Sequence, residues 1–295
     1  MRLFFLLTLF LLLDCPAAYA NALTMGTIGN SPVEEIRRFT PVVRKIAALM
    51  QLPEIDGGEV MMAADIQHMA ELLQKGKVDF YYDSPLPSLA VNHLAGSEMV
   101  LRRWKHDHPE YTSLIFVKKE STIQDLAGLN GEVIGFKDEY SSSGHLLPRI
   151  ALEEAGLRLV PLPEKGPSAR IPGQTGYLFT RGNENSIVWV AFGRIAAGTI
   201  SREEFIAKSK GDLDKLRILH ETFPIPRQVI NIRPGLPERV KSALLRTLTG
   251  LEGTPEGQEV MRQFEKTTRF DPLPGEAISR LESIKPIVLK ILGLS

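Results

Sequence analysis

The alternation of short apolar segments with amphipathic segments constrains the fold of this chain most. Residues 23–28 and 78–82 read as buried strands, and between them residues 33–50 carry apolar side chains at helical spacing. A short strand near residues 60–63 and a helix that opens at Asp65 complete the pattern. Strands that alternate with helices predict an α/β unit, with a mainly parallel sheet and helices on its faces.

The same alternation starts again near Ser121, which predicts a second α/β unit. Further strands are expected at residues 112–117, 132–136, 159–160, 186–191, 216–219 and 228–232. A helix is expected over residues 144–155, and the chain beyond residue 232 reads as mostly helical. Ser31 and Ser201 each stand three residues before a glutamate, which predicts a capping box at a helix start.

The first twenty residues are expected to be a secretory signal peptide. Arg2 precedes the apolar run at residues 3–13, and small residues lead up to Ala20, after which we expect cleavage. Cys15 would be the lipidated residue of a lipoprotein, but Asp14 stands where such a signal has a small residue, so lipid anchoring is not expected. The apolar run is too short to span a bilayer comfortably. We therefore expect an exported, periplasmic protein.

Charge and cysteine content narrow the range of functions. The chain has 35 basic and 35 acidic side chains, so no net field favours nucleic acid. No cysteine follows Cys15, which excludes disulfides, thiolate metal clusters and a cysteine nucleophile in the cleaved chain. The run His106-Asp107-His108 lies in a charged stretch and is more typical of a solvated loop than of a metal site. Neither a nucleophile elbow nor a zinc-protease motif occurs, so we expect no catalytic residues, metal or cofactor.

The stretch SSSGH at residues 141–145 is the most specific local signal. It follows a buried strand and precedes a helix in which Pro148 falls in the first turn, where a proline costs little. The free NH groups and positive dipole end of a helix start, next to serine hydroxyls, favour an oxyanion site. The alternative is that one serine simply caps the helix, although capping does not explain all three hydroxyls.

Four stretches, taken in order, are similar to a known family. They are residues 75–80, residues 125–131, residues 141–148, and residues 224–226 together with 256–257. This order resembles the substrate-binding proteins of phosphate, phosphite and phosphonate ABC transporters. The resemblance implies the two-lobed periplasmic binding protein fold of type II. Lobe 1 would comprise residues 21–115 and 220–295, and lobe 2 residues 116–219.

The resemblance also implies a function. An interlobe cleft would close on a small phosphorus oxyanion, either phosphonate, phosphite or phosphate, and the protein would deliver this ligand to an ABC permease. The alternative is a sensing protein of the same fold that acts on a membrane sensor kinase. In either case we expect a monomer.

Ligand-binding residues follow by position. The resemblance implies that Ser141, Ser142 and Ser143 hold the oxyanion and that Gly144 allows close approach of the backbone. His145, in the first turn of the helix, could reach the same anion. Further candidates at the ends of strands and of the crossover are Thr27, Asn30, Tyr82, Ser84 and Tyr111. Because rigid dipoles can bind a dianion, this site does not require a lysine cluster.

The second lobe departs from the family pattern at the positions that recognise an amine. Family members that bind aminophosphonates are similar in having acidic and histidine residues near the positions of residues 171–190. Here that span has no histidine, and Glu184, in an expected loop, is its only acid. Ala196 stands where the family usually has an aspartate. The ligand is therefore expected to lack an amine.

Overall fold

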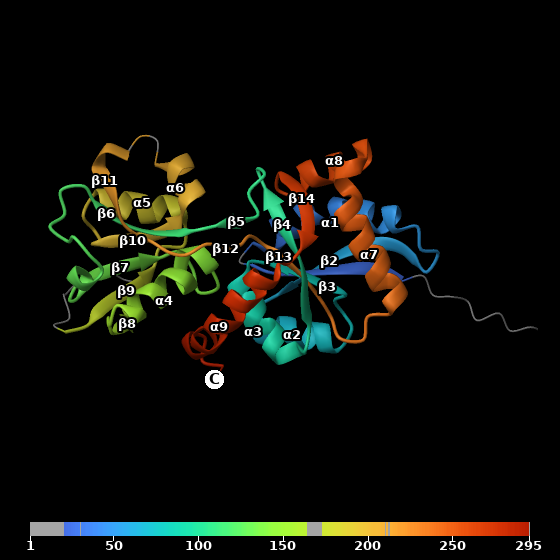
Figure 1. Cartoon of the computed structure of the whole chain (residues 1–295), viewed down its shortest axis with the longest axis horizontal. Coiled ribbons are helices and arrows are strands. Elements are labelled where there is room, and N and C mark those ends of the chain that lie inside the picture. The colour runs from blue at the N-terminus through green and yellow to red at the C-terminus, as the bar shows by residue number, and fades with distance from the viewer. Residues whose placement is uncertain (1–20, 30, 164–172, 210, 212, 295) are drawn as a thin grey trace, which may run out of the picture.

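The computed structural model describes residues 21–29, 31–163, 173–209, 211 and 213–294. The signal peptide predicted for residues 1–20 lies outside these residues. Two α/β lobes, each with its own six-stranded sheet, lie side by side and are joined by a two-stranded connection (Figure 1). The type II binding-protein fold predicted from the sequence is thus the observed architecture.

The sheet of lobe 1 has the order β14-β4-β13-β3-β1-β2. Its strands are β1 (Asn21–Ile28), β2 (Ile55–Ala63), β3 (Phe80–Asp83), β4 (Glu98–Lys105), β13 (Val229–Ile232) and β14 (Thr267–Pro272). The strands β2, β1 and β3 are parallel, as the alternation predicts, whereas β13, β4 and β14 pair antiparallel. The sheet is therefore mixed.

The sheet of lobe 2 has the order β11-β6-β10-β7-β9-β8. Its strands are β6 (Ser113–Lys118), β7 (Val133–Phe136), β8 (Leu159–Pro161), β9 (Thr175–Phe179), β10 (Ala197–Ser201) and β11 (Leu216–Glu221). The strands β10, β7, β9 and β8 are parallel, and β6 and β11 complete the sheet antiparallel.

The chain passes between the lobes twice, beside the short antiparallel pair of β5 (Glu110–Tyr111) and β12 (Ile225–Pro226). The first passage lies between Tyr111 and Ser113, and the second between Glu221 and Ile225. The boundaries expected after residues 115 and 219 therefore fall inside β6 and β11.

Helices cover both faces of each sheet. Those of lobe 1 are α1 (Pro32–Met50), α2 (Ile66–Gln74), α3 (Pro85–Ala95), α7 (Glu238–Gly250), α8 (Pro255–Gln263) and α9 (Gly275–Ile291). Those of lobe 2 are α4 (Leu147–Glu154), α5 (Asn183–Ala191) and α6 (Arg202–Lys208), with a π-helical turn, η2 (Ser142–Leu146), before α4. Three 3-10 turns add η1 (Ala127–Leu129), η3 (Leu213–Lys215) and η4 (Leu251–Gly253).

Alternation along β3 sends neighbouring side chains to opposite faces of the first sheet. Phe80 and Tyr82 pack with α1, α7 and α8, whereas Tyr81 packs with α2, α3 and α9. Tyr81 and Tyr82 therefore lie on opposite faces of the lobe 1 sheet.

Two expectations about local structure are wrong. Residues 186–191 form most of helix α5 rather than a strand, because Ile187, Val190 and Ala191 share one buried helical face against lobe 2. Glu184 accordingly lies in the first turn of α5 instead of a loop, and pairs with Lys208. The predicted cap of α1 is also absent, since the Ser31 side chain forms no capping hydrogen bond.

The cap predicted at the start of α6 is confirmed. The Ser201 hydroxyl accepts a hydrogen bond from the Glu204 NH at 3.4 Å. The predicted helix over residues 144–155 is confirmed in position, but its first turn is η2 and only residues 147–154 are α-helical.

A buried apolar cluster joins the two lobes beside the crossover. Leu146, Leu147 and Ile150 of lobe 2 pack in it with side chains of α3, α9 and the β5–β12 pair. We call this group the interlobe cluster; its remaining buried members are Leu86, Leu89, Tyr111, Ile225, Val229, Leu273, Leu281, Ile284 and Val288.

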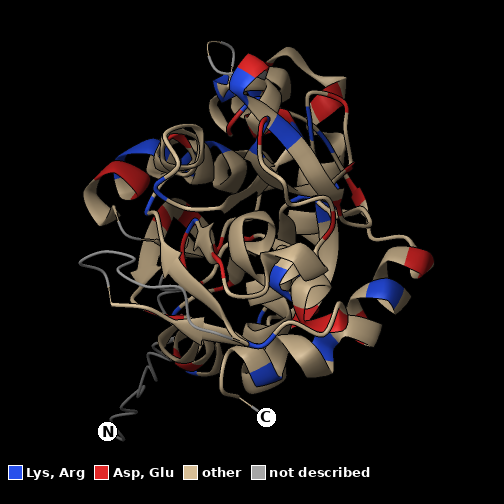
Figure 2. Ribbon diagram, turned by 90° about the vertical axis from the view of Figure 1, so that its left-hand side faces the viewer, with Lys and Arg blue, Asp and Glu red and all other residues tan. Residues whose placement is uncertain are grey.

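In Figure 2, lysine and arginine residues are interspersed with aspartate and glutamate residues along the ribbon. Among the helices that the structure describes, none has the length and apolar character needed to cross a membrane.

Candidate functional site

A cavity of about 570 Å³ is walled by residues of both lobes. Lobe 1 contributes the end of β1, the end of β3 and side chains from α1 and β4, and lobe 2 contributes the loop from β7 into η2 and parts of the β9–α5 and β10–α6 connections. Its wall contains Ile28, Gly29, Glu35, Asp83, Ser84, Lys105, Tyr111, Lys137, Asp138, Tyr140, Ser141, Ser142, Ser143, Arg181, Asn183, Ser201, Glu204, Arg227 and Gln228. Parallel strands of both sheets thus end at the cavity, as expected for an α/β ligand site.

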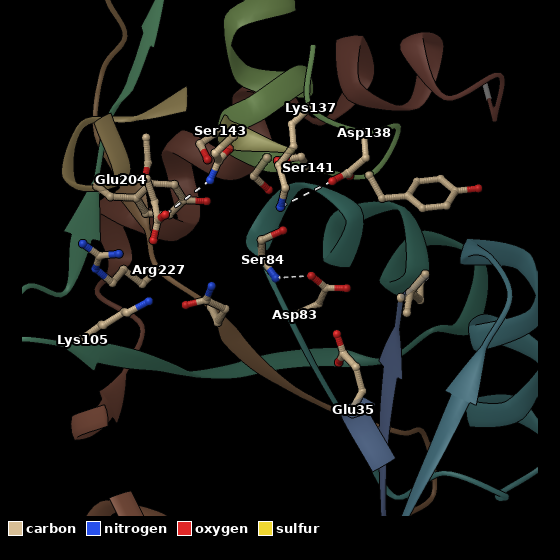
Figure 3. A pocket seen from close by; sticks show the side chains of 18 of the residues that line it. Glu35, Asp83, Ser84, Lys105, Lys137, Asp138, Ser141, Ser143, Glu204 and Arg227 are labelled. Atoms are coloured by element: carbon tan, nitrogen blue, oxygen red, sulfur yellow. Dashed lines mark hydrogen bonds and ion pairs between the residues drawn. The ribbon is translucent and has the colours of Figure 1, made fainter. Parts of the chain in front are cut away.

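The serine loop (residues 141–143) forms one wall of this cavity (Figure 3). Each of its three hydroxyls has a different environment. Ser141 caps η2, because its Oγ accepts from the Gly144 NH at 3.0 Å. Ser142 is buried, and its Oγ accepts from the Leu86 NH at 3.1 Å, which links lobe 2 to the start of α3 in lobe 1. Ser143 Oγ forms no hydrogen bond with any described residue and faces the cavity.

The backbone of the serine loop is held from behind. Ser113 donates its hydroxyl to the Ser143 carbonyl at 2.5 Å, and Thr199 donates to the Gly144 carbonyl at 2.6 Å. The Lys137 NH also donates to the Gly144 carbonyl, at 2.8 Å. These bonds fix the loop so that its hydroxyl and NH donors keep one orientation.

Glycine is required at residue 144 by close approach. A Cβ added at Gly144 would lie 2.5 Å from the Cβ of Lys137 and 2.8 Å from Ser141 Oγ. Gly144 itself is buried and does not line the cavity.

Asp83, at the end of β3, lies in the opposite wall. One carboxylate oxygen accepts from the Ser84 NH at 2.6 Å, and the other accepts from the Tyr81 hydroxyl at 2.7 Å. No described cation forms an ion pair with Asp83. Burial raises the pKa of this carboxyl to about 7, and the nearby Asp138 carboxylate adds to the effect.

Cationic side chains stand apart from Asp83. In Figure 3, Lys105 and Arg227 lie on one side of the cavity with Glu204, whereas Asp83 and Glu35 lie on the other side. Burial, followed by repulsion from a neighbouring arginine, lowers the pKa of the Lys105 ammonium. In the described part of the chain, Lys105 has no ion-pair partner.

Arg227 is held rigidly beside the crossover. Its guanidinium donates to the His108 carbonyl at 3.1 Å, pairs with Glu203 at 2.8 Å and stacks over the Tyr111 ring at 5.3 Å. Burial raises the pKa of the Tyr111 hydroxyl, so this side chain remains a neutral donor. Arg227 therefore presents a fixed positive charge to the cavity.

A further ion pair lines the lobe 2 wall. The Lys137 ammonium lies 3.5 Å from a carboxylate oxygen of Asp138. Across the cavity, burial raises the pKa of the Glu35 carboxyl, and Lys137 acts in the opposite direction. The whole wall carries four cationic side chains and four carboxylates: Lys105, Lys137, Arg181, Arg227, Glu35, Asp83, Asp138 and Glu204.

The structure brings together half of the predicted ligand-binding residues. Ser84, Tyr111, Ser141, Ser142 and Ser143 line the cavity.

The other predicted residues lie elsewhere. Thr27 is buried one residue before the cavity-lining Ile28, and Asn30 is not among the described residues. Tyr82 packs against Phe39 and Phe264 in the core of lobe 1.

His145 is buried behind the serine loop. Its Nδ1 lies 2.8 Å from the Glu139 carbonyl, and its ring packs against Phe136 and Phe179. Burial lowers the pKa of the imidazole to about 4, so His145 is neutral at ordinary pH. It supports the loop from within lobe 2 and does not line the cavity.

Several cavity residues were not identified from the sequence, among them Glu35, Lys105, Arg227 and Gln228. Lys137 could have been found, because it follows directly after the strand that leads into the serine loop. Lys105 and Arg227 come from the lobe 1 side of the two passages and carry no local motif.

The chemistry of the wall is that of a binding site. It offers neutral donors, fixed cations and carboxylates around one cavity. Within the described ranges, no group of three or more histidine, cysteine, aspartate or glutamate side chains is placed to hold a metal ion.

Comparison with solved structures gives the same architecture. A protein from Xanthomonas citri, solved bound to ATP, is 25% identical and superposes with a TM-score of 0.83, covering 92% of this chain and 98% of that chain. PhnD1 from Prochlorococcus marinus, solved in complex with methylphosphonate, is 17% identical with a TM-score of 0.66, covering 93% and 99%. A binding protein component of an ABC phosphonate transporter from Pseudomonas aeruginosa is 17% identical with a TM-score of 0.64, covering 90% and 87%.

The sequence itself identifies the family. Residues 29–276 match the family described as ABC transporter, phosphonate, periplasmic substrate-binding protein. This span includes both lobes and every described residue of the cavity wall except Ile28. The chain therefore belongs to the family of periplasmic substrate-binding proteins of phosphonate ABC transporters, and it is an exported solute-binding protein.

Proposed function

We propose that this protein captures a phosphorus oxyanion, such as a phosphonate, phosphite or phosphate, in the interlobe cavity and delivers it to an ABC permease. One observation carries the proposal. The Ser143 hydroxyl, which has no hydrogen-bond partner among the described residues, faces a cavity whose wall also presents Lys105 and Arg227.

The free hydrogen-bond donors of the serine loop support a phosphorus oxyanion as the ligand. The NH groups of Ser142 and Ser143 open η2 and donate to no acceptor among the described residues. Free NH groups at the start of a helical segment, with the aligned peptide dipoles behind them, favour an oxyanion. Charge-assisted hydrogen bonds are shorter and stronger than neutral ones, so a few fixed donors can hold a dianion.

The start of α3 in lobe 1 also faces this region, but it has few free NH donors for an anion. Pro85 and Pro87 have no NH, the Leu86 NH donates to Ser142, and the Ser84 NH donates to Asp83. These contacts support binding of the anion against the serine loop rather than against α3.

A second candidate is an organic phosphate larger than a simple oxyanion. The cavity volume of about 570 Å³ is in the range of pockets that hold drug-sized ligands. It would leave much space around methylphosphonate, and the 25% identical Xanthomonas citri protein was solved with ATP. A phosphate ester would place its phosphoryl group at the serine loop and its organic part in the remaining volume.

Isothermal titration of the protein without residues 1–20 tests both candidates. The ligands are phosphate, phosphite, methylphosphonate, 2-aminoethylphosphonate and ATP, with Ser143→Ala and Arg227→Gln as variants. We expect binding of at least one ligand and a weaker affinity in both variants. Absence of binding across the panel, or an affinity that neither variant changes, would contradict the proposal.

Delivery to a permease and cleavage after Ala20 are further parts of the proposal. Sequencing the N-terminus of the exported protein checks the cleavage site. Ligand uptake by cells with and without the protein, in a strain that carries the cognate permease, checks transport.

A further inference from the structure

Asp83 is unexpected in the wall of an anion site. Its carboxylate has two hydrogen-bond donors, the Ser84 NH at 2.6 Å and the Tyr81 hydroxyl at 2.7 Å. It has no ion pair with any cation that the structure describes, whereas Asp138 in the same cavity lies 3.5 Å from the Lys137 ammonium. A bound anion would therefore meet an uncompensated negative charge at Asp83.

A proton removes this conflict. A carboxylate with two donors still has lone pairs available, so a proton placed on it can point toward a ligand oxygen. A second negative charge within a few ångströms disfavours the ionised carboxylate. Arrival of an oxyanion therefore favours retention of one proton between Asp83 and the ligand.

We propose that Asp83 is a specificity-determining residue that shares a single proton with an oxygen of the bound ligand. This inference rests on the proposed function. The proton comes either from the P–OH group of a ligand monoanion or from solvent, and in both cases the complex contains one O–H···O bond between ligand and carboxyl. The site then selects oxyanions that are basic enough to share a proton, such as phosphonates, over weakly basic sulfonates of the same shape.

The surroundings of Asp83 are consistent with a carboxyl that holds a proton near neutral pH. Burial is the main cause of its raised pKa, about 7, and the ordinary value is 3.8. Its electrostatic neighbours among the described residues include Tyr81 and Tyr82 of β3, Tyr111 of β5 and Asp138 of lobe 2. None of these is a cation.

An asparagine side chain in place of Asp83 would imitate the protonated carboxyl without titrating, so the test uses Asp83→Asn. The amide oxygen can accept from the Ser84 NH, and the NH₂ group can donate to the Tyr81 oxygen or to the ligand. The matched control is Asp56→Asn, which makes the same change at an exposed aspartate of β2 that does not line the cavity.

The first measurement is proton uptake on binding of methylphosphonate. Titration calorimetry at pH 7.5 in two buffers with different ionisation enthalpies gives the number of protons taken up. We expect the wild-type protein to take up roughly half a proton or more per ligand beyond Asp83→Asn, and Asp56→Asn to behave as the wild type does. Equal uptake by the wild type and Asp83→Asn, or lower uptake by the wild type, would overturn the inference.

The second measurement compares methylphosphonate with methanesulfonate, which has the same shape. We expect the wild type to prefer the phosphonate by at least about tenfold, the effect of one hydrogen bond to a charged group, and Asp83→Asn to reduce this preference several-fold. An unchanged preference also overturns the inference. If the wild type binds no oxyanion at all, the proposed function fails and the inference fails with it, whereas binding without an Asp83 effect removes the inference alone.

A third measurement needs no ligand. Carboxyl ¹³C NMR of the unliganded protein, with Asp83→Asn to assign the signal, follows the titration of Asp83 directly. We expect a midpoint near neutral pH. A midpoint at the ordinary value for aspartate would contradict the inference.

Discussion

The two walls of the cavity differ in the groups that they present. The serine loop of lobe 2 presents neutral donors, and local hydrogen bonds from Gly144, Ser113 and Thr199 fix its shape. The lobe 1 wall at Asp83 presents a carboxylate in an environment that disfavours its charge. Under the proposed function, one wall attracts the anion, while the other determines which anion is accepted.

Replacement of the Asp83 charge should have the largest effect on stability. A folded-state pKa near 7, above the ordinary 3.8, means that the folded protein holds the proton more tightly than the unfolded chain does. This contribution to stability is complete below pH 4 and is lost as the pH rises to 7, a change of up to about 4 kcal/mol. Asp83→Asn should therefore be more stable than the wild type at pH 8 and similar at pH 4.

Urea unfolding of both proteins at the two pH values checks this prediction. Asp56→Asn, at an exposed aspartate outside the cavity, serves as the control and should show no such gain. A difference between Asp83→Asn and the wild type that is the same at pH 4 and pH 8 would contradict it.

A methyl group behind the serine loop should disturb the opposite wall. In Gly144→Ala the new Cβ meets Lys137 and Ser141 at distances that require both to move. We expect a loss of about 1–3 kcal/mol in unfolding free energy, as for other overpacked sites, together with weaker anion binding. Gly275→Ala is the control, because a Cβ there has no neighbour within 4 Å. Equal stability of the two variants would contradict this prediction, because it would mean that Lys137 and Ser141 move aside at no cost in free energy.

Two serines of the same loop should differ from each other. Ser142→Ala leaves the Leu86 NH without its acceptor and should cost about 1 kcal/mol or more of stability. Ser143→Ala removes a hydroxyl with no partner among the described residues, so its stability should be unchanged while its affinity for the anion falls. Thermal unfolding and titration calorimetry of both variants separate the two roles. Similar profiles for both variants would remove the distinction.

The smallest expected effect compares helix caps in the two lobes. Ser201→Ala breaks the bond from Ser201 Oγ to the Glu204 NH and should cost about 1 kcal/mol, whereas Ser31→Ala breaks no capping bond and should cost close to nothing. Denaturant midpoints of the two variants measure the difference. A cost at Ser31 equal to that at Ser201 would mean that the α1 cap forms in solution.

The features that depend on local sequence could be predicted. Strands β1, β3, β6 and β7 follow from short apolar runs, and the serine loop follows from three hydroxyls between a strand and a helix. Sequence alternation therefore predicted the α/β units, the family resemblance predicted their two-lobed arrangement, and the serine motif predicted one wall of the cavity.

The remainder depends on tertiary contacts. The β-branched run at residues 186–191 favours a strand by propensity, but burial of one helical face determines its structure. The roles of Asp83 and Lys105 arise from the burial of each and from the distance of each to opposite charges, which no local pattern encodes.

The interlobe cluster has a mechanical consequence. Leu146 and Leu147, the residues that continue directly from the serine loop, are anchored in it beside the β5–β12 pair. In a rotation of one lobe against the other, residues close to the connection between the lobes move least. If one lobe rotates against the other about the β5–β12 pair, the serine loop and the start of α3 would stay in contact, because the interlobe cluster and the bond from the Leu86 NH to Ser142 Oγ join them there.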